Sequence, residues 1–141
     1  MNKREKAMAF HSQGYNCAQS VFLAFCDDLS ISAVDAARLS LPFGGGMGQM
    51  RETCGALTGA FMVLGMTDAA GTPPTHVEKA ACYARVRLFA EKFHAQNGSM
   101  LCRELLAKAQ ADGRAKNCHE LVGSTAEELE KFLNQAEDSL S

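Results

Sequence analysis

The chain has 141 residues, about the size of one ordinary domain, of which 47% are hydrophobic and 21% are charged. Its formal net charge of −2 and the lack of a basic stripe exclude a typical nucleic-acid-binding surface. The most apolar stretch, residues 56–66, is too short to span a bilayer, and no secretory signal pattern stands at the N-terminus. We therefore expect a single domain over residues 1–141 in the cytoplasm, where cysteines are usually thiols, metal ligands or redox groups.

The first third of the chain predicts three short helices followed by a loop. Capping residues and apolar stripes at helical spacing place the helices at 4–12, 17–27 and 32–39. Asn16 is the expected N-cap of the second helix, and Pro42 ends the third. The segment from Phe43 to Gly48 then carries four glycines in five positions, which predicts an irregular loop able to take positive φ.

Longer helices are predicted in the remainder of the chain. Capping signals and apolar periodicity place them at 54–66, 75–96, 99–106 and 118–122, with a last helix beginning at Ser124. Thr53, Ser99 and Asn117 are the expected N-caps of three of them, and the apolar stripe of the longest includes Val77, Leu88 and Phe89. Because no β-alternation is present, the predicted fold is all-α, a compact bundle of about six helices with a glycine-rich loop.

The helix predicted over 54–66 carries small residues on one face, namely Gly55, Ala56, Gly59 and Ala60. A glycine inside a helix costs roughly 0.5–1 kcal/mol relative to alanine. We therefore expect a neighbouring element to pack closely against this face. The same face is compatible with a homodimer.

Four of the six cysteines fall at predicted helix starts: Cys17, Cys54, Cys102 and Cys118. The six form no CxxC pair and neither a zinc-ribbon nor a ferredoxin spacing. A helix start offers a partial positive charge and unpaired N–H groups, which stabilise a thiolate and lower its pKa. We therefore expect these four to form one redox or metal-ligating set. Buried cysteine also serves as a small hydrophobe, and this is the interpretation for Cys26 and Cys82.

The glycine loop, His119 and Arg51 each allow a functional and a purely structural interpretation. Gly44, Gly45, Gly46 and Gly48 can form an anion- or cofactor-binding nest, although a close-packed loop over the cysteines is favoured. The loop lacks the Lys-Ser/Thr ending of a P-loop, so nucleotide binding is not expected. His119 can assist Cys118 but is interpreted as a surface residue. Arg51 can tune the pKa of Cys54 or face water.

Several motifs, taken in order along nearly the whole chain, resemble the redox-active family named for its pattern C_GCAxxG_C_C. They are Gly14-Tyr15-Asn16-Cys17-Ala18, the glycine loop, Cys54-Gly55-Ala56-Leu57-Thr58-Gly59, Cys102 and Cys118. The resemblance implies redox activity at these four cysteines. The family is also similar to a domain of the split-Soret cytochromes, in which such cysteines are associated with an iron–sulfur cluster. No CxxCH motif is present, so covalent c-type haem is not expected.

Three hypotheses about function remain open at this point. In the first, four thiolates hold an iron–sulfur cluster that exchanges electrons with a redox partner. Because zinc also binds four thiolates in a tetrahedral arrangement, a structural zinc ion is the alternative metal for the same ligands. In the second, one cysteine pair of a metal-free thiol–disulfide oxidoreductase cycles through a disulfide. In the third, the chain is a non-catalytic helical interaction module with inert cysteines.

Overall fold

The structure, a computed structural model, describes the backbone of residues 1–68 and 70–140 and the side chains of these residues as far as Gln135. Its described residues form seven α-helices and no β-strand, which confirms the all-α prediction. The helices are α1 Lys3–Ser12, α2 Cys17–Ala24, α3 Ala33–Ser40, α4 Gly55–Thr67, α5 His76–Asn97, α6 Cys102–Ala111 and α7 Cys118–Leu140. Two short 3₁₀ helices, Cys26–Asp28 and Leu41–Phe43, follow α2 and α3. The helix predicted over 17–27 is thus divided in two.

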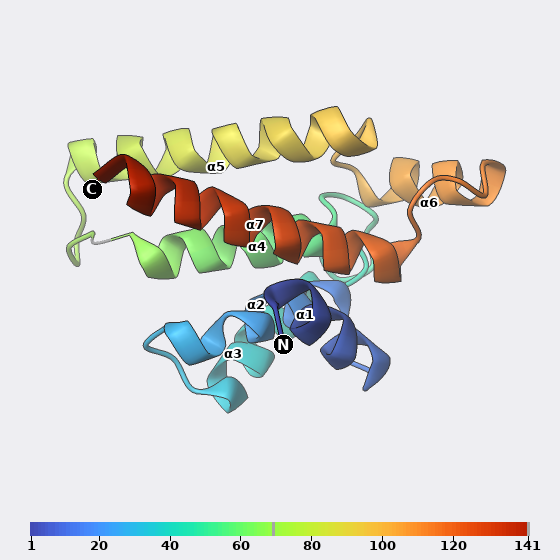
Figure 1. The fold of residues 1–141 in the computed structure, drawn as a ribbon, viewed down its shortest axis with the longest axis horizontal. Coiled ribbons are helices and arrows are strands. Elements are labelled where there is room, and N and C mark those ends of the chain that lie inside the picture. The colour runs from blue at the N-terminus through green and yellow to red at the C-terminus, as the bar shows by residue number, and fades with distance from the viewer. Residues whose placement is uncertain (69, 141) are drawn as a thin grey trace.

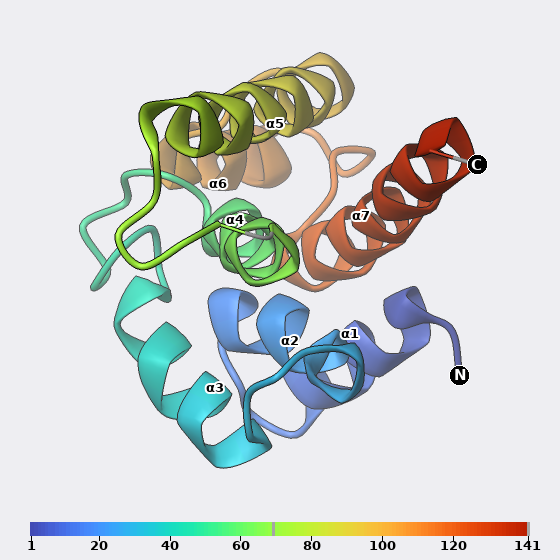
Figure 2. The same ribbon diagram turned by 90° about the vertical axis from the view of Figure 1, so that its left-hand side faces the viewer.

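The long helices run side by side, and the N-terminal helices cover one side of them. In Figure 1, α4, α5 and α7 follow the long axis of the molecule, with α1, α2 and α3 below them. Figure 2 looks nearly along the long helices and shows α4 at the centre. Helix α1 packs against α7, and α2 packs against α4. Helices α2, α4 and α7 all begin at the same end of the molecule, on the right in Figure 1. In the described residues, no helix has the length and hydropathy needed to cross a membrane.

The hydrophobic core lies where α2, α4 and α7 meet. Its largest fully buried side chains include Phe22, Leu57, Leu64, Phe89 and Leu129. Each side chain of this kind stabilises the fold by about 1.5–3 kcal/mol relative to an exposed position. This burial fixes the three helices against one another and thereby fixes where each of them begins.

Glycines in α4 let α2 approach closely. A Cβ atom at Gly59 would lie 2.7 Å from the carbonyl oxygen of Ala18, and one at Gly55 would lie 3.2 Å from the backbone nitrogen of Ala18. Both distances are shorter than ordinary contacts, so only glycine fits at the observed spacing. The expectation of a closely packed neighbour is confirmed, and the neighbour is α2.

The C-terminal region is one continuous helix, whereas the sequence predicted a break before Ser124. Gly123 lies inside α7 and faces α1, where a Cβ atom would lie 2.6 Å from Met8 Sδ. The Ser124 hydroxyl donates to the Leu121 carbonyl within the helix at 3.4 Å instead of capping a new one. Glycine at this position serves close helix packing and does not end the helix.

Helix α5 begins as predicted but buries only part of the predicted apolar stripe. The capping box formed by Thr75 and Glu78 is present. Phe89 of the predicted stripe is buried, together with Phe93, whereas Val77 and Leu88 are 78% and 49% exposed. Helical spacing therefore identified the helix and one of its core residues, but placed the centre of the buried face one residue away from its true position.

Candidate functional site

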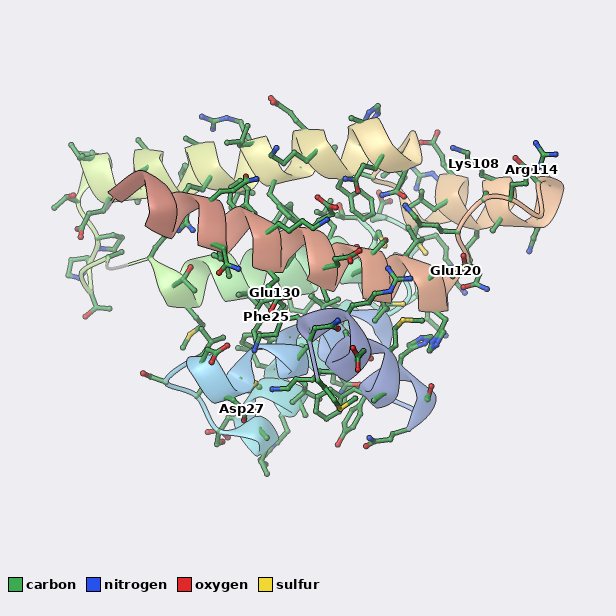
Figure 3. All side chains as sticks on the ribbon, in the orientation of Figure 1. Phe25, Asp27, Lys108, Arg114, Glu120 and Glu130 are labelled. Atoms are coloured by element: carbon green, nitrogen blue, oxygen red, sulfur yellow. The ribbon has the colours of Figure 1, made fainter. Side chains whose placement is uncertain are left out.

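Four cysteines from distant parts of the chain line one cavity of about 210 Å³: Cys17, Cys54, Cys102 and Cys118. Three of them are the first residues of α2, α6 and α7, and Cys54 directly precedes α4. The cavity lies toward the end of the molecule that Figure 3 marks by Glu120, in the first turn of α7. The structure thus brings together the four cysteines that the sequence singled out.

The remaining two cysteines lie outside this cavity. Cys26 is buried, and its thiol donates to the carbonyl oxygen of Phe22 at 3.5 Å. Cys82 is partly exposed on α5. All six cysteines are free thiols.

Asparagine caps place two of the cavity cysteines. The Asn16 side chain accepts from the Gln19 N–H at 2.9 Å, and the Gln19 side chain accepts from the Asn16 N–H at 3.0 Å. This reciprocal capping box starts α2 at Cys17. At α7, the Asn117 side chain accepts from the backbone N–H of Glu120 at 2.9 Å, so that the helix starts at Cys118. Both caps are those that the sequence predicted.

The caps of the other two helices differ from the prediction by one or two residues. Cys54 itself is the N-cap of α4, where the sequence favoured Thr53. Leu101 is the N-cap of α6, where the sequence favoured Ser99. The Ser99 hydroxyl instead accepts from the backbone N–H of Leu101 at 3.0 Å, before the helix begins. Cys54 therefore stands just outside its helix, with its side chain beside the unpaired N–H groups of the first turn.

An isolated antiparallel bridge between Thr53 and Leu101 places Cys54 beside Cys102. The N–H of Cys54 donates to the Met100 carbonyl at 2.9 Å, next to the bridge. On its other side, the Cys102 N–H donates to the carbonyl of Glu52 at 2.6 Å. So short a bridge has no alternating pattern, so no local signal predicts it.

The glycine-rich loop packs directly over the cysteines. Gly45 and Gly46 line the cavity. Gly46 has a φ of 73°, and a Cβ atom there would lie 2.6 Å from Cys102 Cβ, so a larger residue would displace Cys102. Gly44 faces the Asn16 side chain, and Gly48 lies away from the cavity lining. Two of the four glycines predicted as a binding loop thus reach the cavity.

Three residues other than glycine, in the loop and just after it, also have left-handed backbones: Met47, Gln49 and Arg51, with φ values of 68°, 62° and 61°. Each costs roughly 1–2 kcal/mol for an L-residue. Hydrogen bonds hold this conformation, with Gln49 N–H donating to the Gly44 carbonyl and Arg51 N–H to the Gly45 carbonyl, each at 3.1 Å. Such strain persists only where the surroundings determine the backbone, and here it brings Arg51 to the cavity.

Arg51 supplies a positive charge to the cavity lining. Its Nη1 atom donates to Cys102 Sγ at 3.7 Å. Arg51 is exposed to water, as one of the two predicted alternatives has it, and its thiol partner is Cys102, where the sequence suggested Cys54. His11 and Lys116 also contribute to the lining, so three basic residues stand among the four thiols.

Cys17 and Cys118 form a hydrogen-bonded thiol–thiolate pair. The Cys17 thiol donates to Cys118, and this bond lowers the pKa of Cys118 below its ordinary value, with a further contribution from the charge of Arg51. The same hydrogen bond, together with burial, raises the pKa of Cys17. The proton of the pair is therefore favoured on Cys17 and thiolate character on Cys118.

Burial dominates at Cys54 and raises the pKa of its thiol to about 11. The N–H groups of Ala56 and Leu57, at the start of α4, act in the opposite direction. The expectation that each helix start yields a low-pKa thiolate is therefore correct for Cys118 but wrong for Cys17 and Cys54. Without an added cation, the cavity does not hold several thiolate charges together, because their mutual repulsion and desolvation outweigh the helix ends.

A histidine pair stands beside the cavity. His11 Nδ1 lies 2.8 Å from His119 Nδ1, so one ring must donate and the other accept. Burial, and next the charge of His119, lower the pKa of His11. The sequence predicted His119 to be a surface residue, whereas the structure places it, half-buried, against His11. The two histidines are 108 residues apart in the chain, and no local pattern joins them.

Aliphatic side chains complete the cavity walls: Leu105, Leu106, Ala109 and Leu121. Apolar walls exclude water and strengthen the electrostatic interactions within the cavity. In the part of the chain that the structure describes, no three His, Cys, Asp or Glu side chains converge closely enough to hold a single metal ion.

A larger groove, of about 1080 Å³, lies elsewhere in the molecule. Its lining includes Phe25 and Glu130, both labelled in Figure 3, together with Val63 of α4 and Leu88 of α5. No cysteine or histidine belongs to this lining. Despite its size, the groove offers no redox-active side chain, so the cysteine cavity is the candidate functional site.

Comparison with known proteins gives one match, to a protein family. No curated protein and no solved structure matches the chain. The family described as "Putative redox-active protein (C_GCAxxG_C_C)" matches residues 15–132, which include all four cavity cysteines and the glycine loop. The chain belongs to this C_GCAxxG_C_C family of redox-active proteins.

Proposed function

We propose that the protein transfers electrons through an iron–sulfur cluster held by Cys17, Cys54, Cys102 and Cys118. The observation that carries the proposal is the single cavity that these four side chains line. Four thiols around a space of about 210 Å³ suit a compact group that lies between them.

The size and donor chemistry of the cavity support a cluster. An engineered cavity of about 150 Å³ holds a benzene molecule, so a cavity of about 210 Å³ accommodates a compact inorganic core. Four cysteine thiolates are the usual ligands of [2Fe–2S] and [4Fe–4S] clusters, and they also suit zinc. Sulfur atoms spaced around a cavity favour a cluster over a single zinc ion. When bound, such a cluster supplies one-electron redox chemistry.

The surroundings of the four thiols support the same assignment. Binding a cluster requires four deprotonated sulfurs, and the chain offers four helix starts, the Arg51 guanidinium and Lys116 beside them. Hydrogen bonds to the sulfurs and exclusion of water are known means of setting cluster potentials. The glycine loop and the aliphatic walls cover the cavity. An electron-transfer role also implies a redox partner.

The test is purification and reconstitution without oxygen. Protein purified anaerobically, or incubated with ferrous iron, sulfide and a thiol reductant, should be brown, absorb visible light and contain iron and acid-labile sulfide. The absorbance should bleach on reduction and return on oxidation. Protein that stays colourless and binds zinc alone, or no metal, after this treatment would contradict the proposal.

The Cys17–Cys118 contact favours a second candidate, a thiol–disulfide function without metal. A hydrogen-bonded thiol beside a thiolate is the arrangement from which a disulfide forms, because the thiolate is the nucleophile. On oxidation the two sulfurs would bond, and two electrons and the proton of Cys17 would pass to a disulfide acceptor, which would take a second proton from solvent and become two thiols. Cys54 and Cys102 would then be supporting residues.

In metal-free, reduced protein, we expect iodoacetamide to modify Cys118 at a lower pH than Cys17 or Cys54. The reason is that the pKa of Cys118 is lowered, whereas those of the other two are raised. Mass-spectrometric peptide mapping over a pH series measures this order directly. Cys17→Ala removes the hydrogen-bond donor and should shift the modification of Cys118 to higher pH. Equal pH profiles for the three cysteines would contradict the thiol–thiolate pair.

A further inference from the structure

We propose that Arg51 sets the reduction potential of the cysteine site, as a fixed positive charge that donates a hydrogen bond to its sulfur. The inference rests on the proposed redox function of the four cysteines. Arg51 Nη1 donates to Cys102 Sγ at 3.7 Å, and Arg51 lines the cavity that the cysteines share. Among the described side chains, Arg51 is the one cation that donates a hydrogen bond to a sulfur atom.

The backbone around Arg51 fixes the position of its charge. The Arg51 N–H donates to the Gly45 carbonyl at 3.1 Å. The Arg51 carbonyl accepts from the backbone N–H and from Nη1 of Arg103, each at 3.3 Å. These bonds hold Arg51 at a φ of 61°. The left-handed backbone at Arg51 therefore holds its guanidinium group beside the cavity.

Neighbouring charges leave Arg51 as the main cation facing the sulfurs. Glu52, the adjacent carboxylate, forms its ion pair with Arg103 at 3.4 Å. Lys116 also lines the cavity, but its ammonium donates to the Asn97 side chain at 3.2 Å. The charge of Arg51 is therefore not neutralised by the carboxylate beside it, and that of Lys116 is directed to another partner.

The sign of the effect follows from charge. Reducing a thiolate-ligated cluster adds one negative charge to the cavity, and a nearby cation stabilises the reduced state, which raises the potential. In a metal-free site, two electrons and two protons convert one disulfide to two thiols, and the same cation stabilises any thiolate formed. Removal of Arg51 should lower the potential in both cases. Because Arg51 is also exposed to solvent, dissolved salt should weaken its influence.

The experiment compares Arg51→Gln and Arg51→Lys with the wild type in optical redox titrations of the iron-reconstituted protein. Arg51→Gln should reduce the equilibrium constant for reduction about tenfold, which is a fall of about 59 mV for a one-electron couple. Arg51→Lys should retain most of the wild-type potential. The difference between Arg51→Gln and wild type should shrink at high ionic strength, which a merely structural role would not produce.

A matched control and a second variant keep the test decisive. Arg87→Gln removes the same charge from α5, outside the cavity lining, and should leave the potential unchanged. Arg51→Gly removes the charge from a left-handed position that glycine adopts without strain, so it serves if Arg51→Gln does not fold. An unchanged potential in a folded charge-removing variant at low salt, or an equal shift in Arg87→Gln, would overturn the inference.

Failure of the proposed cluster is distinguishable from failure of this inference. Iron and sulfide uptake by the wild type tests the cluster alone. If the wild type takes up neither, the same variants are equilibrated as metal-free protein with glutathione buffers. Arg51→Gln should then lower the two-electron potential by about 30 mV for a tenfold change, and an unchanged value would overturn the role of Arg51.

Discussion

Replacing any one of the four cavity cysteines with serine should weaken iron binding in reconstituted protein by more than about 100-fold. Loss of an outer-shell partner alone typically reduces metal affinity 10- to 100-fold, and loss of a ligand should cost more. Cys54→Ser and Cys102→Ser should have the larger effects, because both side chains are buried and water cannot readily replace them. Cys17 and Cys118 are partly exposed, so their serine variants should retain some iron.

The measurement is iron and acid-labile sulfide per chain after anaerobic reconstitution and gel filtration. Cys82→Ser is the matched control, because this partly exposed cysteine lies on α5 outside the cavity lining, and its iron content should equal that of the wild type. Far-UV circular dichroism of the metal-free variants checks that each one folds. Full iron content in folded Cys54→Ser and Cys102→Ser would rule out a cluster held by these four residues.

Local signals in the sequence were sufficient to predict most helix starts, and through them the cysteine positions. Asn16 and Asn117 cap α2 and α7 as expected, because an N-cap depends on side-chain and backbone groups within a few residues. Cys17 and Cys118 are therefore first-turn residues, as predicted. The glycines of α4 also indicated close packing correctly, because a helical glycine is costly unless a neighbour occupies the space.

Features that depend on distant pairs could not be predicted in this way. The bridge between Thr53 and Leu101 and the contact between His11 and His119 each join segments that share no local pattern. The partner of Arg51 depends on a left-handed loop whose course is fixed by hydrogen bonds rather than by propensity. The bridge places Cys54 beside Cys102, and the loop places the guanidinium of Arg51 on Cys102.

The same reasoning explains the error at Gly123. A glycine followed by serine is typical of a helix boundary, and the sequence alone gives no reason to prefer a continuous helix. The reason lies in α1, where Met8 occupies the space that a side chain at position 123 would need. Helix α7 tolerates the glycine because its buried residues, including Leu129, hold it against the core on both sides of that position.

Two glycines of one helix should respond in opposite directions to the same substitution. Gly59→Ala should reduce the free energy of unfolding by about 1–2 kcal/mol, because the added Cβ atom would lie 2.7 Å from the Ala18 carbonyl oxygen. Overpacking of this kind typically costs 1–3 kcal/mol, and the gain of about 0.5–1 kcal/mol from better helix propensity offsets only part of it. Gly65→Ala has open space around its new Cβ atom and should increase the free energy of unfolding by up to about 1 kcal/mol.

Urea unfolding of the metal-free variants, followed by circular dichroism, measures both changes as shifts of the midpoint at constant slope. A stabilised Gly59→Ala variant would show that α2 and α4 are not held at the observed spacing. The consequence for the site is equally specific. Since α2 begins at Cys17 and α4 directly follows Cys54, any separation of these helices should also move the two sulfurs apart. Gly59→Ala should therefore take up less iron than the wild type under conditions where it is fully folded, whereas Gly65→Ala should load normally.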